Sequence, residues 1–408
     1  MKKILVMSAL AAVSTAFVAC SSDDDLVQQA PVVPEVKGTP FSISVNADTR
    51  ATLYNADAWG TSGANAVTML KLYGKQNGQT TPWLNSAVFT RSATSADWTA
   101  NRDATHTSLG ETEKPTWPKT NANVATDFYA ITDNAIGDGT TALISNVGAW
   151  MTTPGTFDYT MGTLTANLPQ IDKVEGTGYV VEGGVSTDYV DASKLKDLMV
   201  ASATTKETTD GKLDLAFSHI LAGLNVKIIF RNDAVYNDAS GSKNASIHYI
   251  KIMGLKTSGA YSYTSGWSGL SDYVCYYKAF STPIVVNAFL EESTAAAADE
   301  NKWLVSNTDP WMVIPQTTDP WDCQGLESGD YIADGKAYVV LGITDHQDTE
   351  DVEVFLPLDT EFVAGKNKTL RLDLGKFRDL YNNTGEAAYY FAPAAGGGGA
   401  RGYDFVDE

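Results

Sequence analysis

Short runs of alternating apolar and polar residues limit most strongly how this chain can fold. Phe41–Val45, Leu224–Phe230 and Leu370–Leu374 place an apolar side chain at every second position. Successive side chains of a strand point to opposite faces, so this period predicts strands with one face in a core and one in water. Clusters of Gly, Asn, Asp, Ser and Thr separate the runs, as turns do. The pattern therefore predicts an all-β chain built of β-sandwiches.

Helical windows are scarce in the rest of the chain. Only Lys194–Val200 and Ser293–Lys302 are predicted as short helices. Further strands are predicted, in chain order, at Val67–Tyr73, Thr126–Ile131, Tyr179–Val181, Ile247–Met253, Ile284–Leu290, Trp303–Val305, Trp311–Ile314, Ala337–Ile343 and Val352–Leu358.

The composition of the chain excludes several classes of function and of binding site. The 408 residues carry a formal net charge of −20, which argues against nucleic acid as a partner because cations must displace counterions from phosphates. Hydrophobic residues make up 43% of the chain, enough for a large core. Three cysteines exclude a disulfide scaffold, and four histidines leave little material for a zinc site.

The N-terminus predicts export. Lys2 and Lys3 precede an apolar stretch, Ile4–Val18, which is too short to span a bilayer. Residues 1–19 therefore read as a signal peptide. Cys20 follows small residues and resembles the acylated cysteine of a bacterial lipobox, which would tie the chain to outer-membrane lipid. The alternative is an ordinary signal peptide with an incidental Cys20.

Residues 20–40 read as a tether. Ser21–Asp25 is an acidic run that resembles the surface-export signal of Bacteroidetes lipoproteins, with a solvated spacer as the alternative. Three prolines and no period follow. Cys275 and Cys323 could pair with each other or lie apart as buried small residues.

A search for chemistry finds no nucleophile elbow, no zinc-binding helix motif, no phosphate loop and no paired-cysteine motif. His219 is interpreted as a satisfied core or edge histidine rather than a base. The acidic run from Asp345 to Asp351 lacks the spacing of a calcium loop and is interpreted as a solvated hairpin loop. The expectation is no enzyme, no cofactor and no metal. Nine tryptophans could stack on sugars, but most are expected in the core; those considered are Trp83, Trp98, Trp117, Trp267, Trp303, Trp311 and Trp321.

Several segments together resemble the fimbrillin family, the type V pilins of Bacteroidia. They are Thr49-Arg50-Ala51, Asp197–Ala201, Leu213–Leu224, Ile250–Leu255, Val313–Thr317 and Leu370–Leu374. The resemblance implies two transthyretin-like β-sandwich domains in series. Placed on this chain, these are residues 41–265 and 266–408, the second with a tail that could donate a strand.

The resemblance also implies a route of assembly outside the cell. An Arg-specific protease would cut between Arg50 and Ala51 and remove the first strand, with its inward residues Phe41, Ile43 and Val45. Loop segments of small polar residues, such as the one before Arg50, are where proteases act. A strand from another pilus subunit, of the same or another kind, would then fill the groove; the candidate donor residues are Tyr389, Phe391, Tyr403 and Phe405.

The resemblance favours a structural or adhesive fimbrial subunit at the outer membrane and cell surface, with a host or bacterial surface ligand as a further partner. The alternative is a surface glycan-binding lipoprotein, which the tryptophans motivate. A surface hydrolase with an unrecognised carboxylate pair is the third reading, although nothing singles out a pair among 49 acidic residues.

Overall fold

The structure is a computed structural model, and it describes residues within one compact unit, Gly38–Glu408. No helix occurs among the described residues, so none of them forms an apolar helix long enough to cross a membrane. The described residues are 39, 41–47, 69–91, 98–100, 117, 123–132, 155–174, 178–191, 195, 197–229, 246–285, 301–305, 310–321, 335–344, 351–373 and 403–407.

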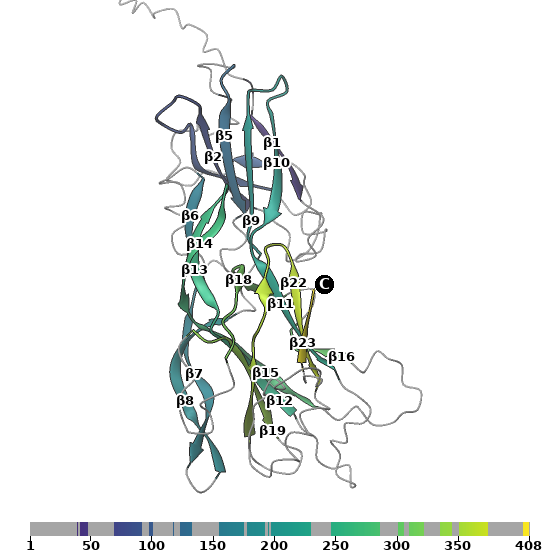
Figure 1. The fold of residues 1–408 in the computed structure, drawn as a ribbon. Helices are drawn as coiled ribbons and strands as arrows, with labels where there is room; N and C mark the ends of the chain where they lie inside the picture. Colours follow the sequence, from purple (N-terminus) through teal and green to yellow (C-terminus); the bar gives the residue numbers. More distant parts are fainter. Residues whose placement is uncertain are drawn as a thin grey trace, which may run out of the picture. The chain divides into compact units, whose positions relative to one another are not determined.

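The first sheet has seven strands and carries β1 at one edge (Figure 1). β1 is parallel to its neighbour β10, and the other neighbouring strands are antiparallel. In spatial order the strands are β1 (Ser42–Ala47), β10 (Lys212–His219), β9 (Met199–Thr205), β5 (Thr126–Thr132), β2 (Met69–Gln76), β3 (Leu84–Thr90) and β4 (Thr99–Ala100).

Two further sheets contain most of the remaining strands. In the second sheet, β11 is parallel to β22, and β23 pairs with the other edge of β22. The second sheet consists of β16 (Asn301–Trp303), β11 (Ala222–Ile229), β22 (Asn367–Asp373) and β23 (Tyr403–Asp407), with β17 (Trp311–Val313) also paired to β11. The third consists of β20 (Asp351–Pro357), β19 (Tyr338–Thr344), β12 (Ser246–Met253), β15 (Cys275–Val285), β8 (Gly178–Asp191) and β7 (Leu164–Val174).

Two small sheets complete the described fold. One consists of β14 (Gly266–Tyr273), β13 (Lys256–Ser262) and β6 (Thr156–Thr160), and the other of β18 (Gln316–Thr317) and β21 (Glu361–Phe362). The Gln316 side chain joins them: its Oε1 accepts from the Lys256 amide (2.9 Å) and its Nε2 donates to the Lys256 carbonyl (3.0 Å). A glutamine here therefore satisfies the backbone of Lys256 as a neighbouring strand would.

The alternating sequence pattern predicts strands correctly where buried and exposed side chains also alternate. Along β10 the odd-numbered residues Leu213, Leu215 and Phe217 are buried while their neighbours are exposed. The predicted all-β fold is confirmed. Most of the strand predictions overlap observed strands, and only the first two residues of Ile284–Leu290 are described, at the end of β15.

The prediction of a helix at Lys194–Val200 is wrong. Met199 and Val200 open β9, whose edges pair with β5 and β10. Leu195 and Leu198 are both buried, and their spacing of three also suits one face of a helix. This spacing explains why the sequence pattern predicted a helix here. Of Ser293–Lys302, only Asn301 and Lys302 are described, and they belong to strand β16.

The predicted boundary between residues 265 and 266 falls in the hairpin that joins β13 to β14. The second and third sheets each combine strands from both sides of it. The division into two sandwiches stays a prediction.

The backbone at Gly254, directly after β12, lies very close to the backbone at Lys336, and substitutions at two glycines can test this contact. Gly254 and Gly266 both have φ of +76°, but a Cβ on Gly254 would lie 2.1 Å from the Lys336 carbonyl oxygen, whereas one on Gly266 meets nothing within 4 Å. Gly254→Ala is expected to lower the free energy of unfolding by about 1–3 kcal/mol more than Gly266→Ala. Urea unfolding followed by tryptophan fluorescence gives both values, and equal losses would contradict the close contact.

Candidate functional site

The outer edge of the first sheet is the candidate site. β1 pairs with β10 in parallel from Ser42 opposite Lys212 to Ala47 opposite Phe217, and no described strand pairs with its other edge. An edge strand is held by one ladder of hydrogen bonds instead of two, and its outer backbone groups remain available for another strand.

The inward face of β1 is the apolar half of its alternation. Phe41 and Ile43 are 3% and 7% exposed and Val45 is partly buried, whereas Ser42 between them is exposed. The structure thus places the three residues predicted for the removable strand on the core side.

Phe41 is enclosed by four aromatic rings, Trp83, Phe89, Trp117 and Phe128, which we call the aromatic box. Their centroids lie 5.4–6.0 Å from the centroid of Phe41. Edge-to-face, tilted and stacked pairs at such distances stabilise beyond the area they bury. Phe41, directly before β1, therefore adds a strongly packed side chain to a strand that is attached along one edge.

Trp117 and Gly211 hold the beginning of β1. The Trp117 amide donates to the Thr39 carbonyl (3.0 Å), and its indole Nε1 donates to the Gly211 carbonyl (2.8 Å). The Ser42 amide donates to that same Gly211 carbonyl (3.1 Å). The Gly211 carbonyl oxygen thus accepts hydrogen bonds both from β1 and from Trp117 of the aromatic box.

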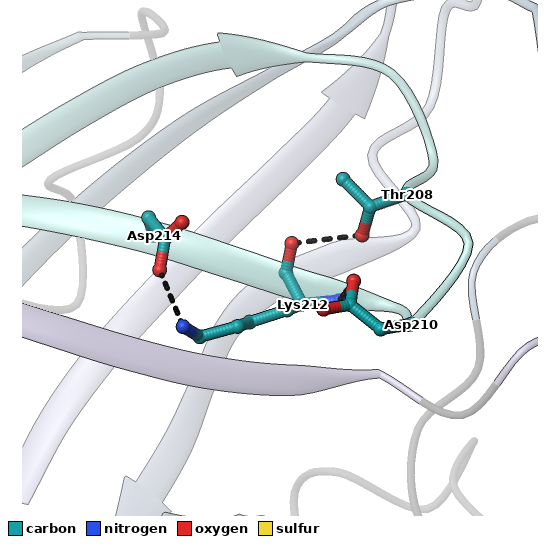
Figure 2. A network of polar contacts seen from close by, with 4 residues as sticks. All are labelled: Thr208, Asp210, Lys212 and Asp214. Atoms are coloured by element: carbon teal, nitrogen blue, oxygen red, sulfur yellow. Dashed lines mark hydrogen bonds and ion pairs between the residues drawn. The ribbon is translucent and has the colours of Figure 1, made fainter.

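The turn that presents Gly211 is fixed by local hydrogen bonds (Figure 2). Thr208 Oγ1 donates to the Lys212 carbonyl (3.0 Å), and the Lys212 amide donates to Asp210 Oδ1 (3.2 Å). The hydrogen bond from Lys212, followed by that from Thr208, lowers the pKa of Asp210. Gly211 has φ of +69°, which favours glycine at this position.

The candidate donor residues divide into two groups. Tyr389 and Phe391 lie outside the described residues. Tyr403 and Phe405 belong to β23, which pairs antiparallel with β22 from Leu372 opposite Tyr403 to Lys368 opposite Asp407 (Figure 1). Phe405 packs against the larger core cluster, and Lys368 Nζ forms an ion pair with Asp407.

His219 has a structural partner. Its Nδ1 contacts Asp197 Oδ2, and the two side chains are 5% and 1% exposed. Burial raises the pKa of Asp197, and the hydrogen bond from His219 opposes that rise. The interpretation of His219 as a satisfied core histidine is confirmed, and sequence reasoning missed its partner, 22 positions earlier.

The other sequence candidates do not gather into a site. Trp117, Trp311 and Trp321 are buried, and Trp83, Trp98 and Trp267 are partly buried against the core, so these six form no exposed platform for sugars. Cys275 is buried and Cys323 lies outside the described residues. No group of three His, Cys, Asp or Glu within the described ranges could hold a metal ion.

The remaining predicted residues also lie outside the described ranges. They are Cys20, Arg50, Ala51 and the acidic loop from Asp345 to Glu350. Asp351, the last residue of the predicted loop, opens β20.

Truncating Phe41 tests how strongly the aromatic box holds β1. Phe41→Ala is expected to cost about 3–5 kcal/mol of the free energy of unfolding, because a large buried side chain is lost and a cavity is left. Ser42→Ala, one position along on the exposed face, is the matched control and is expected to change stability by at most about 0.5 kcal/mol. Both follow from urea unfolding curves, and similar effects of the two substitutions would contradict the packing described.

Removing His219 tests the buried pair. His219→Ala leaves the Asp197 carboxylate buried and unpaired, a change that typically costs about 3–5 kcal/mol. Adding Asp197→Asn is expected to restore part of that loss at neutral pH, because the amide carries no charge.

The gap between the single and double variants is expected to narrow as the pH falls. The raised pKa of Asp197 means that the folded state binds its proton readily, so the stability lost by ionisation above that pKa returns below it. Thermal unfolding of both variants across pH measures this, and a gap that widens on acidification would contradict it.

The chain is similar to several solved structures. Three solved structures illustrate the likeness. One is a candidate cell adhesion protein from Bacteroides ovatus, 12% identical, covering 83% of this chain and 92% of its own, with a TM-score of 0.40. A candidate cell adhesion protein from Bacteroides uniformis is 13% identical over 91% of this chain and 96% of its own, with a TM-score of 0.37. A fimbrial protein from Bacteroides ovatus is 12% identical over 87% of this chain and 50% of its own, with a TM-score of 0.31.

The identities and TM-scores of these structures are too low to assign a function. No curated protein matches the chain. A family model described as fimbrillin-like matches residues 49–387, which is most of the sequence. Because this match spans more than half of the sequence, the chain belongs to the fimbrillin-like family.

Proposed function

We propose that this fimbrillin-like chain is a structural subunit of a surface fimbria that polymerises by exchanging its first strand. Export would run through the signal peptide and an acylated Cys20 to the outer membrane and cell surface. An Arg-specific protease would then cut between Arg50 and Ala51. A strand of another subunit would replace β1.

The observation that carries the proposal is the position of β1. It is an edge strand with its apolar face packed in the core, and its last residue, Ala47, precedes Arg50 by three positions. Three residues span at most about 10 Å. A cut after Arg50 therefore separates β1 from the rest of the fold within a short distance of the strand's end.

The energetics favour a durable joint once β1 is lost. Each large apolar side chain that re-enters the groove regains about 1.5–3 kcal/mol, and each restored hydrogen bond to β10 adds about 0.5–1.5 kcal/mol. For a strand of six residues the sum is comparable with the whole stability of a domain, about 5–15 kcal/mol. An occupant of this groove is expected to dissociate slowly.

The geometry of such a joint leads to filaments. One subunit accepts a strand at β1 and donates another from elsewhere, so the contact is head-to-tail and generates an open array rather than a closed ring. Membership of the fimbrillin-like family supports a structural, non-enzymatic role. The donor side, the division into two sandwiches and a ligand on another surface stay predictions.

Treating the purified full chain with an Arg-specific protease tests the proposal. We expect ladders of polymer that resist detergent, seen by gel electrophoresis without boiling. Arg50→Ala is expected to leave monomers, because β1 stays attached. Arg102→Ala is the matched control and is expected to form ladders as the parent does. Ladders that persist in the Arg50 variant, or a trimmed parent that stays monomeric at every concentration, would refute strand exchange at this site.

A further inference from the structure

We propose that a hollow on the first sheet, lined by β2 and β5, binds one ring of a neutral saccharide. The hollow has a volume of about 160 Å³. Its lining consists of Tyr73 and Lys75 of β2, Asp127 and Tyr129 of β5, and the turn of residues 76–79. The site is separate from β1 and adds a ligand-binding role that strand exchange does not require.

The hollow lies on the face of the first sheet away from the aromatic box. Leu72 of β2 and Phe128 of β5 belong to the core cluster that contains Phe41. Tyr73 and Tyr129, one position further along each strand, point to the opposite face because successive side chains alternate. β9 and β10 also separate these two strands from β1 (Figure 1). A ligand in the hollow therefore leaves the packing of β1 untouched.

Two tyrosines form the apolar wall of the hollow. Tyr73 and Tyr129 lie opposite each other on β2 and β5, with ring centroids 6.1 Å apart and ring planes inclined by 43°. Burial raises the pKa of both phenols, so both hydroxyls stay protonated at neutral pH and can donate hydrogen bonds. A tyrosine combines an apolar ring with a polar tip. A sugar ring, with apolar C–H groups and polar hydroxyls, matches that combination.

Two groups of opposite charge lie beside the tyrosines. Lys75 and Asp127 are opposite each other, two positions along the same face. Thr204 Oγ1 of β9 donates to Asp127 Oδ1 (2.8 Å) and thereby orients the carboxylate. No ion pair involving Lys75 occurs among the described residues, so its ammonium can reach a ligand. A carboxylate accepts several hydrogen bonds and an ammonium donates three, which suits neighbouring hydroxyls that both donate and accept.

The turn after β2 completes the rim and is held by backbone hydrogen bonds. The Gln79 amide donates to the Gln76 carbonyl (3.1 Å), and the Asn77 amide donates to the carbonyl of Ala125, just before β5 (2.9 Å). The exposed side chains of Asn77 and Gln79 add two amide groups to the rim. The hollow is thus formed without a ligand, as binding sites for small molecules usually are.

Volume and charge select the class of ligand. A cavity of about 150 Å³ accommodates one six-membered carbon ring, so the hollow admits a single sugar ring. The charges of Lys75 and Asp127 cancel, and the chain carries a net charge of −20, which disfavours anions such as phosphates and carboxylates. One ring in an open hollow is expected to bind weakly, with a Kd of about 1 mM. A fimbria of the kind proposed above would repeat the site along its length and raise the overall avidity.

Saturation-transfer NMR of the intact full chain tests the class of ligand. The probes are methyl glycosides of glucose, galactose, mannose, fucose and N-acetylglucosamine at about 10 mM, well above the expected Kd. At least one glycoside is expected to receive saturation at its C–H protons. Acetate, an anion, and trialanine, a peptide, are the contrasting probes. The absence of a glycoside signal, or a glycoside signal no stronger than that of acetate or trialanine, would overturn the proposal.

An isosteric substitution locates the site. Asp127→Asn is expected to weaken glycoside binding about tenfold, because hydrogen bonds to a charged acceptor are stronger than those to an amide. Asp214→Asn is the matched control: Asp214 is an exposed carboxylate of β10 in the same sheet, paired with Lys212 (Figure 2). It is expected to change binding by at most about twofold. Equal effects of the two substitutions would overturn the assignment.

A second substitution does not disturb the hydrogen bond between Asp127 and Thr204. Lys75→Gln removes the other charge of the hollow and is expected to weaken binding about tenfold, whereas Lys206→Gln, at an exposed position after β9, is the control. Thermal unfolding shows that each variant is folded. Unchanged binding in the folded Lys75 variant would overturn the location of the site. Such a failure would leave strand exchange standing, because the hollow and β1 share no residue.

Discussion

The pairing of β1 with β10 is the interaction on which the candidate site depends. It attaches one edge of a six-residue strand and delivers Phe41 into an enclosure of four rings. The two contributions differ in kind. The ladder of hydrogen bonds can be rebuilt by any strand, since backbone groups are common to all residues, whereas the aromatic box distinguishes one side chain from another. Attachment and selection are thus carried by different parts of the same strand.

A comparison with β11 shows how an edge position changes the attachment of a parallel strand. It too is parallel to a strand much later in the chain, from Gly223 opposite Asn367 to Ile229 opposite Asp373. Its other edge, however, pairs with β16 and β17, so it lies inside its sheet. Removing β11 would break ladders on both sides, while among the described strands removing β1 would break the ladder to β10 alone. Equivalent parallel pairings therefore differ in how readily the strand can be released.

Alternation in the sequence located the strands that have one buried face, including β1, β5 and β12, because period two and burial coincide there. It failed where burial does not alternate. β14 has no fully buried residue among its eight, and its core-packed residues Trp267 and Leu270 lie three positions apart, so no period of two marks it. Phe41, Ile43 and Val45 could be assigned to the core side from their spacing alone. Trp117 and Gly211 could not be linked, because they are 94 positions apart and only the folded chain brings the indole to the carbonyl.

Under the proposed strand exchange, the shared Gly211 carbonyl affects the state in which β1 has left and no other strand has yet bound. Losing the Ser42 amide removes one of its two donors, and the Trp117 indole remains as the other. The Gly211 carbonyl oxygen therefore keeps one hydrogen bond, so no penalty for an unsatisfied acceptor favours a rearrangement of the turn. A subunit without a bound strand would therefore keep the conformation of the β9–β10 turn, and an incoming strand would bind to a preformed site instead of inducing its shape.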